Sequence, residues 1–210
     1  IDQPAVSMDG VAMSINLNCG LLIDLQHLND TGADGVGLYR TEIPFMIRPA
    51  YPDVEAQTEL YSRVLELSGD RPIVFRTLDV GGDKPASWQR GPAEANPALG
   101  VRGVRLGQRQ PDLLDDQLRA LVEAASDGEL RIMIPMVAAR EELEAVRSRL
   151  DAIVAAVAGS SGVRPRVVRL GVMIEVPAAV YQTHALSRLV DFISVGSNDL
   201  TQYLLAVDRN

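Results

Sequence analysis

Short apolar runs rich in β-branched residues alternate along the chain with longer stretches in which apolar residues recur at helical spacing. This alternation is typical of an α/β protein with a parallel sheet. The pattern predicts six strands, at 11–17, 35–39, 73–75, 131–135, 169–174 and 191–195. Six strand-and-helix units fit either a doubly wound sheet or a barrel of eight such units, in which case two units are absent from this sequence.

Three apolar stripes predict helices that pack on this sheet. They comprise Leu60, Val64 and Leu67; Leu114, Leu118, Leu121 and Ala125; and Leu143, Val146, Leu150, Ile153 and Val157. Spacings of three and four residues place each set on one face of a helix. The Gly- and Pro-rich segment 81–105 follows the third strand and is predicted to be an extended loop that carries functional residues.

Length, composition and charge narrow the class of protein. A chain of 210 residues with 47% apolar content can bury one substantial core, so residues 1–210 are predicted to form a single domain. The formal charge of −8 argues against nucleic acid and anionic membrane surfaces as partners, because both reward clustered Lys and Arg. No apolar run approaches the ~18 residues of a membrane span. Any anionic substrate must therefore meet a local cationic site.

The single cysteine, Cys19, excludes an internal disulfide and is expected to be a buried apolar residue. A lone thiol suits a reducing compartment, which favours a cytoplasmic location. The first residue is not Met, so the sequence is expected to be a segment of a longer protein. The two histidines, His27 and His184, lie within helical patterns and are expected to be structural.

Charged or polar residues come directly after four of the predicted strands. These residues are Arg40, Arg76, Glu175, Asn198 and Asp199. Taken singly, each could simply mark the surface end of a strand, but the carboxyl ends of parallel strands share one rim, where ligands bind. Arginines suit phosphate or carboxylate groups, and carboxylates with an amide oxygen suit Mg²⁺. The set therefore predicts a site for a phosphorylated substrate and a divalent cation.

Two further segments are weaker signals. The turn at 79–84 combines paired glycines with Lys84, and the segment 96–105 contributes Arg102 and Arg105. Paired glycines let the backbone approach a ligand closely. Alone, each segment is typical of a solvated loop.

Five longer motifs resemble one known family, enzyme I of the phosphotransferase system, which is a phosphoenolpyruvate:protein phosphotransferase. They are GLYRTE at 37–42, FRTLDVGGDK at 75–84, NPALGVR at 96–102, MIEVPAA at 173–179 and GSNDLTQY at 196–203. The motifs occur in the family's order and span nearly the whole chain. The resemblance is to the carboxyl-terminal domain, a (β/α)8 TIM barrel that binds phosphoenolpyruvate (PEP) and Mg²⁺. About six of its eight units are expected here.

The resemblance implies roles for residues at the predicted rim. The groups that hold the substrate would be Arg40, Arg76, Arg102, Asn198, Asp199 and Arg209. Glu175 and Asp199 would bind the metal ion. Phosphoryl transfer to a histidine would follow, with protonation of the remaining enolate to give pyruvate.

The same resemblance places the acceptor histidine and the cysteine that protonates the enolate outside this sequence, because Cys19 does not match the position of that cysteine. No catalytic residue of this kind is expected within 1–210, and the isolated segment is predicted to be inactive. In the family the phosphoryl group passes on to a histidine-containing phosphocarrier protein. The domain also dimerises, so a homodimer that covers the open flank of the partial barrel is expected.

Two features leave alternatives open. The segments 41–46 and 174–181 favour the nitrogen-related branch of the family over the sugar-transport branch. The same barrel occurs in pyruvate phosphate dikinase and PEP synthase, which are alternative sources of this segment. The absent units also allow a non-catalytic module that senses PEP or pyruvate, or docks a partner.

Overall fold

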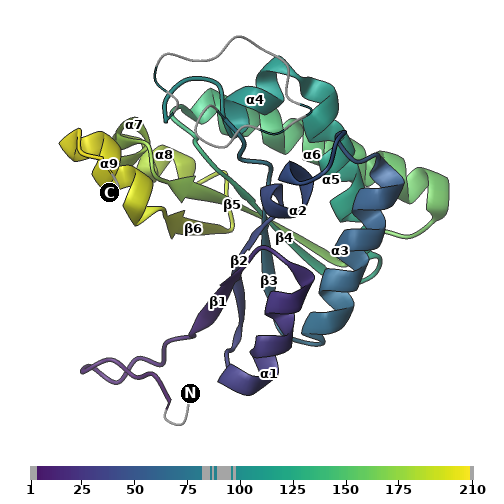
Figure 1. Cartoon of the computed structure of the whole chain (residues 1–210), viewed down its shortest axis with the longest axis horizontal. Helices are drawn as coiled ribbons and strands as arrows, with labels where there is room; N and C mark the ends of the chain where they lie inside the picture. Colours follow the sequence, from purple (N-terminus) through teal and green to yellow (C-terminus); the bar gives the residue numbers. More distant parts are fainter. Residues whose placement is uncertain (1–3, 82–85, 87, 89–95, 97, 209–210) are drawn as a thin grey trace.

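The computed structural model describes residues 4–81, 86, 88, 96 and 98–208. Six strands form one parallel sheet: β1 Asn16–Cys19, β2 Gly35–Arg40, β3 Ile73–Arg76, β4 Glu129–Ile134, β5 Val167–Ile174 and β6 Phe192–Val195. Each strand pairs with the next one along the chain. A doubly wound sheet would reverse this order partway. The structure is therefore an incomplete (β/α)8-type barrel, and the predicted fold class is confirmed (Figure 1).

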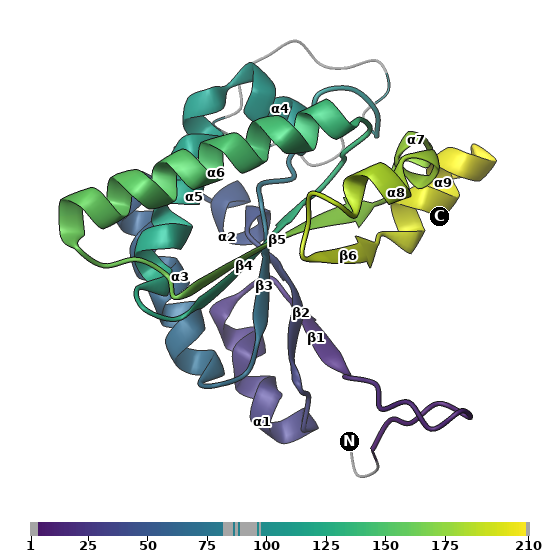
Figure 2. The ribbon, with the colours of Figure 1, turned by 180° about the vertical axis from the view of Figure 1, so that it is seen from behind.

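Helices cover the outer side of the curled sheet (Figures 1 and 2). In chain order, the helices of the described residues are η1 Leu22–Gln26, α1 His27–Thr31, α2 Glu42–Met46, α3 Val54–Ser68, α4 Val104–Arg109, α5 Pro111–Ala125, α6 Arg140–Ser161, α7 Pro177–Tyr181, α8 Thr183–Leu186 and α9 Ser197–Leu205. Helix α5 contacts both α3 and α6, so these three form a continuous outer layer. Within the described ranges, no helix combines the length and apolar character needed to cross a membrane.

Local sequence signals set the bounds of the longest helices. The Asp53 side chain accepts the Ala56 N–H at 2.9 Å and so caps α3. Helix α5 begins with Pro111, whose missing N–H costs nothing in the first turn. Helix α6 ends at Gly162, which adopts a left-handed conformation with a φ of 72° that favours glycine.

Two of the three predicted apolar stripes are confirmed. The 114–125 stripe is buried on α5, and the 143–157 stripe is buried on α6 except for Ile153, which is partly exposed. The 60–67 stripe is confirmed only in part, because Val64 is buried and Leu60 packs against the core but Leu67 is 38% exposed. The buried face of α3 comprises its 57, 61, 64 and 68 positions. This face includes Gln57 and Tyr61, whose polar groups form internal hydrogen bonds. Apolar periodicity alone does not reveal such a face.

The first predicted strand is also wrong in its bounds, whereas the other five strands agree with the prediction to within two residues. Strand β1 begins at Asn16, where pairing with Gly35 of β2 begins. Upstream, Val6 and Ala12 form a short antiparallel bridge. The apolar run at 11–17 predicted a longer strand, but Met13 is 57% exposed and lies before β1.

The predicted loop at 81–105 corresponds to the connection between β3 and α4, although α4 begins at Val104. Residues 82–85, 87, 89–95 and 97, which include Lys84, lie outside the described residues. Trp88 fixes this connection to α2. Its indole N–H donates to the Phe45 carbonyl at 3.0 Å, and its ring lies 4.9 Å from that of Tyr51.

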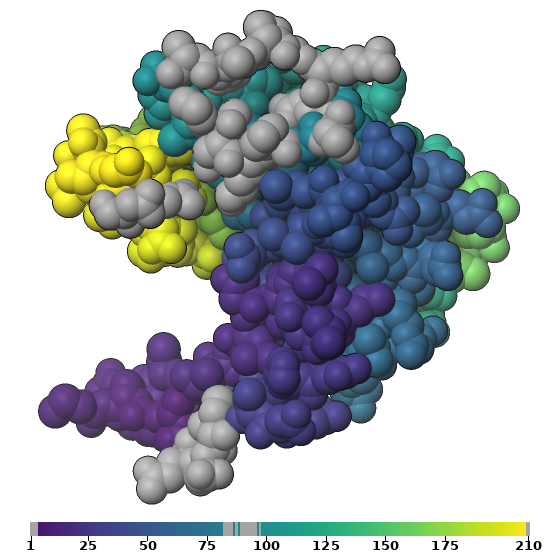
Figure 3. Space-filling model, viewed as in Figure 1, coloured from purple at the N-terminus to yellow at the C-terminus, as the bar shows by residue number. Residues whose placement is uncertain are grey.

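In the described part of the chain, β1 and β6 are the two edges of the sheet. Figure 3 shows the molecule hollowed between the N-terminal residues in purple and the C-terminal residues in yellow. Large apolar side chains are exposed on β6 and before β1: Val11, Met13, Ile15, Ile193 and Val195. A covering surface would stabilise such a flank. The homodimer expected from the sequence stays a prediction.

Candidate functional site

Arg40 and Arg76 reach the inside of the curled sheet because aromatic residues precede them. Tyr39 and Phe75 are fully buried on the helix-covered face, with ring centroids 5.6 Å apart. Successive side chains on a strand point to opposite faces. Arg40 and Arg76 therefore face inward, and they are register partners on β2 and β3.

A cleft of about 420 Å³ opens at this rim of the sheet. Its lining comprises Asn18, Leu38, Arg40, Arg76, Met173, Glu175, Ser194, Val195, Gly196, Ser197, Asn198 and Asp199. Both arginines at the ends of β2 and β3, both predicted metal ligands and the predicted amide are thus brought together. Arg102 does not line the cleft, and Arg209 lies outside the described residues.

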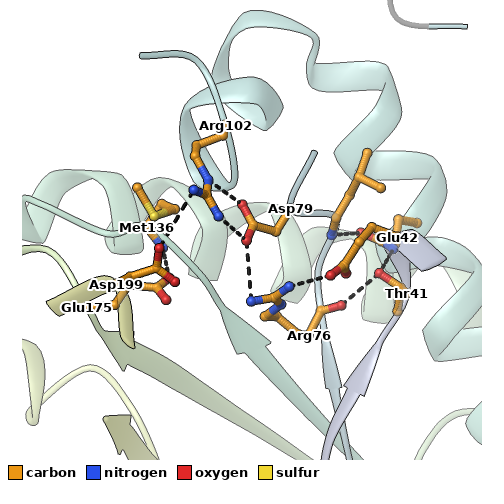
Figure 4. A network of polar contacts seen from close by, with 10 residues as sticks. Thr41, Glu42, Arg76, Asp79, Arg102, Met136, Glu175 and Asp199 are labelled. Carbon is orange, nitrogen blue, oxygen red and sulfur yellow. Dashed lines mark hydrogen bonds and ion pairs between the residues drawn. The ribbon is translucent and has the colours of Figure 1, made fainter. Parts of the chain in front are cut away.

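A row of buried ion pairs, here called the ion-pair ladder, lies behind the cleft (Figure 4). It consists of Glu42, Arg76, Asp79, Arg102 and Asp199. Arg76 pairs with Glu42 at 2.5 Å and with Asp79 at 3.3 Å. Asp79 also pairs with Arg102, which lies 3.7 Å from Asp199. Burial alone would lower the pKa of Arg76, but the neighbouring carboxylates outweigh it and raise that pKa. Arg76 is therefore charged and held in position without a ligand.

Arg102 is 1% exposed and binds Asp79 through two hydrogen bonds, of 3.0 and 2.8 Å. It also donates a hydrogen bond of 3.3 Å to the Tyr203 hydroxyl. A planar guanidinium paired with both oxygens of a carboxylate is a rigid arrangement. Arg102 thus positions Asp79, and the contact of Arg102 with substrate stays a prediction.

Arg40 differs from the other two arginines. In the described part of the chain it pairs with no carboxylate; its buried Nε, like that of Arg76, has no hydrogen-bond partner. A buried donor without a partner is costly. Because the same side chain lines the cleft, an anion bound there would satisfy it.

Glu175 and Asp199 lie side by side at the other end of the ladder (Figure 4). Glu175 Oε1 accepts the Met136 N–H at 2.7 Å, whereas the buried Oε2 has no partner among the described residues. A Cβ on Gly196 would lie 2.7 Å from Oε2, so glycine leaves room for this carboxylate.

The described residues contain no cluster of three or more His, Cys, Asp and Glu side chains suited to a metal. Two carboxylates fit Mg²⁺ nevertheless, because this ion usually keeps several waters and takes further ligands from a phosphorylated substrate. The orphaned oxygen of Glu175 supports that assignment.

The pKa of Glu175 sets a measurable pH dependence. Burial raises the pKa of this carboxyl and the charge of Asp79 adds to the rise, while the Met136 N–H and two arginines offset part of it. An acid with a raised folded-state pKa binds its proton more tightly in the folded chain than in the unfolded chain. Without divalent cations, stability should therefore fall as the pH rises from the ordinary value of 4.5 through the raised value.

Urea unfolding of the parent chain and of Glu175→Gln at about pH 5 and about pH 8, in chelator, measures this effect. The variant should gain stability relative to the parent at the higher pH. Glu141→Gln, at an exposed position on α6, is the control and should show no such gain. A difference between Glu175→Gln and the parent that does not change with pH would contradict the raised pKa.

Sequence reasoning missed Gln117 on α5. Its Nε2 donates to Thr41 Oγ1 and to Tyr61 Oη, both at 3.0 Å, and its Oε1 accepts the Leu78 N–H at 2.8 Å. Thr41 Oγ1 in turn donates to the Arg76 carbonyl at 2.8 Å. Gln117 thus ties the segment after β2 to the segment after β3. The one available signal was a glutamine beside the apolar stripe of α5.

His27 and His184 are exposed on α1 and α8, and neither lines the cleft. Cys19 is 1% exposed, as expected for a buried apolar residue. Burial raises the pKa of its thiol, and the charge of Asp24 adds to the rise. The described residues therefore offer no histidine near the cleft as a phosphoryl acceptor.

Comparison with known proteins places this geometry in context. A family described as PEP-utilising enzyme, PEP-binding domain, matches residues 1–210. A "Phosphoenolpyruvate-dependent phosphotransferase system" protein of Escherichia coli K12 is 41% identical over 100% of this chain and 28% of its own length. A "Phosphoenolpyruvate-protein phosphotransferase" of Haemophilus influenzae is 39% identical over 99% of this chain and 36% of its own. A "Multiphosphoryl transfer protein" of Rhodobacter capsulatus is 42% identical over 99% of this chain and 24% of its own length.

The chain therefore spans about a quarter to a third of the length of these curated relatives. Among solved structures, a citrate lyase from Burkholderia xenovorans LB400 matches with a TM-score of 0.50 and 17% identity. The match covers 93% of this chain and 53% of the lyase. At this identity the likeness supports the barrel fold alone.

Proposed function

The chain belongs to the family of PEP-utilising enzymes, whose PEP-binding domain it matches over its whole length, and from this premise we propose that its cleft binds PEP together with Mg²⁺. One observation carries the proposal. Arg40, Arg76 and Glu175, from the ends of β2, β3 and β5, line a single cleft at the carboxyl rim of a parallel sheet together with Asp199 of α9. This is where barrel enzymes bind their substrates.

Each side chain has a distinct part in binding. Arg40 and Arg76 hold the phosphoryl and carboxylate groups, for which two adjacent guanidiniums provide bidentate hydrogen bonds. Asn198 hydrogen-bonds the substrate from the α9 side of the cleft. Glu175 and Asp199 hold Mg²⁺, which when bound neutralises charge on the phosphoryl oxygens. Because the ion-pair ladder already orders Arg76, little reorganisation accompanies binding.

We extend the proposal to the reaction of the whole protein, a PEP:protein phosphotransferase. The relatives at 39–42% identity carry phosphotransferase or phosphoryl-transfer names, which supports this class. The phosphoryl group would pass to a histidine outside this chain and then to a histidine-containing phosphocarrier protein, leaving pyruvate. The chain alone would bind PEP without transferring its phosphoryl group. A cytoplasmic location, a homodimer and the nitrogen-related branch remain parts of the proposal.

The metal assignment gives a direct experiment. Glu175→Gln and Asp199→Asn should each abolish the increase in PEP affinity that Mg²⁺ produces in the parent chain, because each removes one of two anionic ligands. Calorimetric titration of PEP with and without Mg²⁺ measures the effect. Glu141→Gln, on the exposed face of α6, serves as the matched control. Retention of the Mg²⁺ effect in both site variants would remove the metal assignment.

A further inference from the structure

A second pocket, of about 260 Å³, adjoins the proposed PEP cleft. It is lined by Leu99, Arg105, Met136, Val176, Pro177 and Tyr203. Val176 follows Glu175 directly in the chain, and the Met136 N–H holds Glu175 Oε1 at 2.7 Å. Tyr203 accepts a hydrogen bond from Arg102, which pairs with Asp199. The pocket therefore includes Met136, which holds Glu175, and Tyr203, which contacts the arginine that pairs with Asp199.

The lining combines an apolar surface with one cation. Leu99, Met136, Val176 and Pro177 offer no charge to a ligand, and the Tyr203 hydroxyl already donates to the Ala98 carbonyl at 2.5 Å. Arg105 donates from Nη1 to the Gly100 carbonyl at 3.0 Å. Across the described ranges it has no carboxylate within ion-pair distance. Its remaining N–H groups can bind an anion.

We propose that this pocket binds a small organic monoanion with an apolar body, such as a short-chain carboxylate. The carboxylate would pair with Arg105, and the hydrocarbon part would lie against Leu99, Met136 and Val176. A multiply charged phosphate ester such as PEP suits the pocket poorly, because a single guanidinium would face several charges among apolar walls. A neutral apolar molecule suits it poorly as well, since it would desolvate Arg105 without pairing it.

The pocket is placed to influence the neighbouring cleft. Met136 has a φ of 61°, in the left-handed region, and this conformation directs its N–H to Glu175 (Figure 4). Gly103 packs so closely that a Cβ there would lie 2.8 Å from Met136 Cβ. A ligand against the Met136 side chain therefore acts on a tightly packed residue that positions a proposed metal ligand. This coupling rests on the proposed function, whereas binding to the pocket does not.

Calorimetric titration of the full chain with hexanoate tests the site. Hexanamide lacks the charge and acetate lacks the apolar body, so both should bind far more weakly than hexanoate. Arg105→Gln should weaken hexanoate binding about tenfold or more, the effect of losing one charge-assisted contact. Arg109→Gln, on the same helix and outside the pocket, should leave it unchanged, as should Arg40→Ala in the PEP cleft.

Several outcomes would overturn the proposal. Absence of saturable hexanoate binding, or equally strong binding of hexanamide, would show that Arg105 recognises no anion. Loss of binding in Arg40→Ala but not in Arg105→Gln would place the carboxylate in the PEP cleft. If Arg105→Gln unfolds, Leu99→Glu at a half-exposed position provides a second variant. Its carboxylate beside Arg105 should abolish hexanoate binding, and unchanged binding would contradict the site.

The coupling is tested separately with PEP and Mg²⁺. Saturating hexanoate should change the affinity for PEP and Mg²⁺, and these ligands should change the affinity for hexanoate by the same factor. Independent binding of both ligands would contradict the coupling alone. Failure of PEP to bind, with hexanoate binding intact, would contradict the proposed function and leave the pocket standing.

Discussion

Replacing Arg76 by Met should lower the free energy of unfolding by about 3–5 kcal/mol, the usual cost of removing one partner from a buried ion pair. Arg76 is 5% exposed and pairs with Glu42, which is fully buried. Among the described residues Arg76 is the one cation that pairs with Glu42. Its loss leaves that carboxylate buried and uncompensated. The substitution should also remove PEP binding, because the same guanidinium lines the cleft.

Urea unfolding measures the loss of stability, and two further variants identify its cause. Adding Glu42→Gln to Arg76→Met should restore part of the stability, since it removes the uncompensated charge. Arg149→Met breaks a comparable pair with Asp115, in which the two side chains are 38% and 40% exposed. That substitution should cost only about 0–1 kcal/mol. Equal unfolding midpoints for Arg76→Met and the parent would contradict the buried ladder.

Arg40→Ala should weaken PEP binding about 10- to 100-fold, which corresponds to the ~1.5–3 kcal/mol of a charge-assisted contact. Stability should change by only about 0.5 kcal/mol, because within the described residues Arg40 pairs with no carboxylate. This combination distinguishes a substrate ligand from a structural ion pair. Arg40→Lys should recover part of the affinity, since it restores the charge without the planar fork.

Isothermal titration with PEP and Mg²⁺, paired with thermal unfolding, separates the two quantities for Arg40. Arg166→Ala, at an exposed position before β5, changes the net charge equally and should alter neither. Unchanged PEP affinity in Arg40→Ala would show that Arg40 is an ordinary charged residue at the end of a strand and not a substrate ligand. A large loss of stability would instead make it part of the ladder.

Sequence reasoning located the rim because its signal is local. A run such as Ile73–Phe75 followed directly by Arg76 specifies both a buried strand and the polar group at its end. The choice between a doubly wound sheet and a barrel depends on which strands pair, and that is set by contacts far apart in the sequence. The pairing of each strand with its successor resolved the choice. The identity of the substrate was inferred from the resemblance to a known family, because hydrophobic periodicity carries no information about a substrate.

The parts that escaped prediction are buried polar groups. Gln57 and Tyr61 lie on the core face of α3 because Gln117 and a backbone carbonyl satisfy them. The carbonyl belongs to nearby Pro52, but Gln117 is 56 residues away from Tyr61 in the sequence. The burial of Arg102 against Asp79 was likewise not predicted, and its contact with substrate stays a prediction. A polar residue whose hydrogen-bond or ion-pair partners belong to other elements is predicted from the sequence to be exposed.

A crystal structure of the chain with PEP and Mn²⁺, whose anomalous scattering marks the metal, tests the central claim most directly. The account predicts the phosphoryl and carboxylate groups of PEP against Arg40 and Arg76, with the metal between Glu175 and Asp199. PEP bound away from this cleft, or a metal held by neither carboxylate, would contradict it.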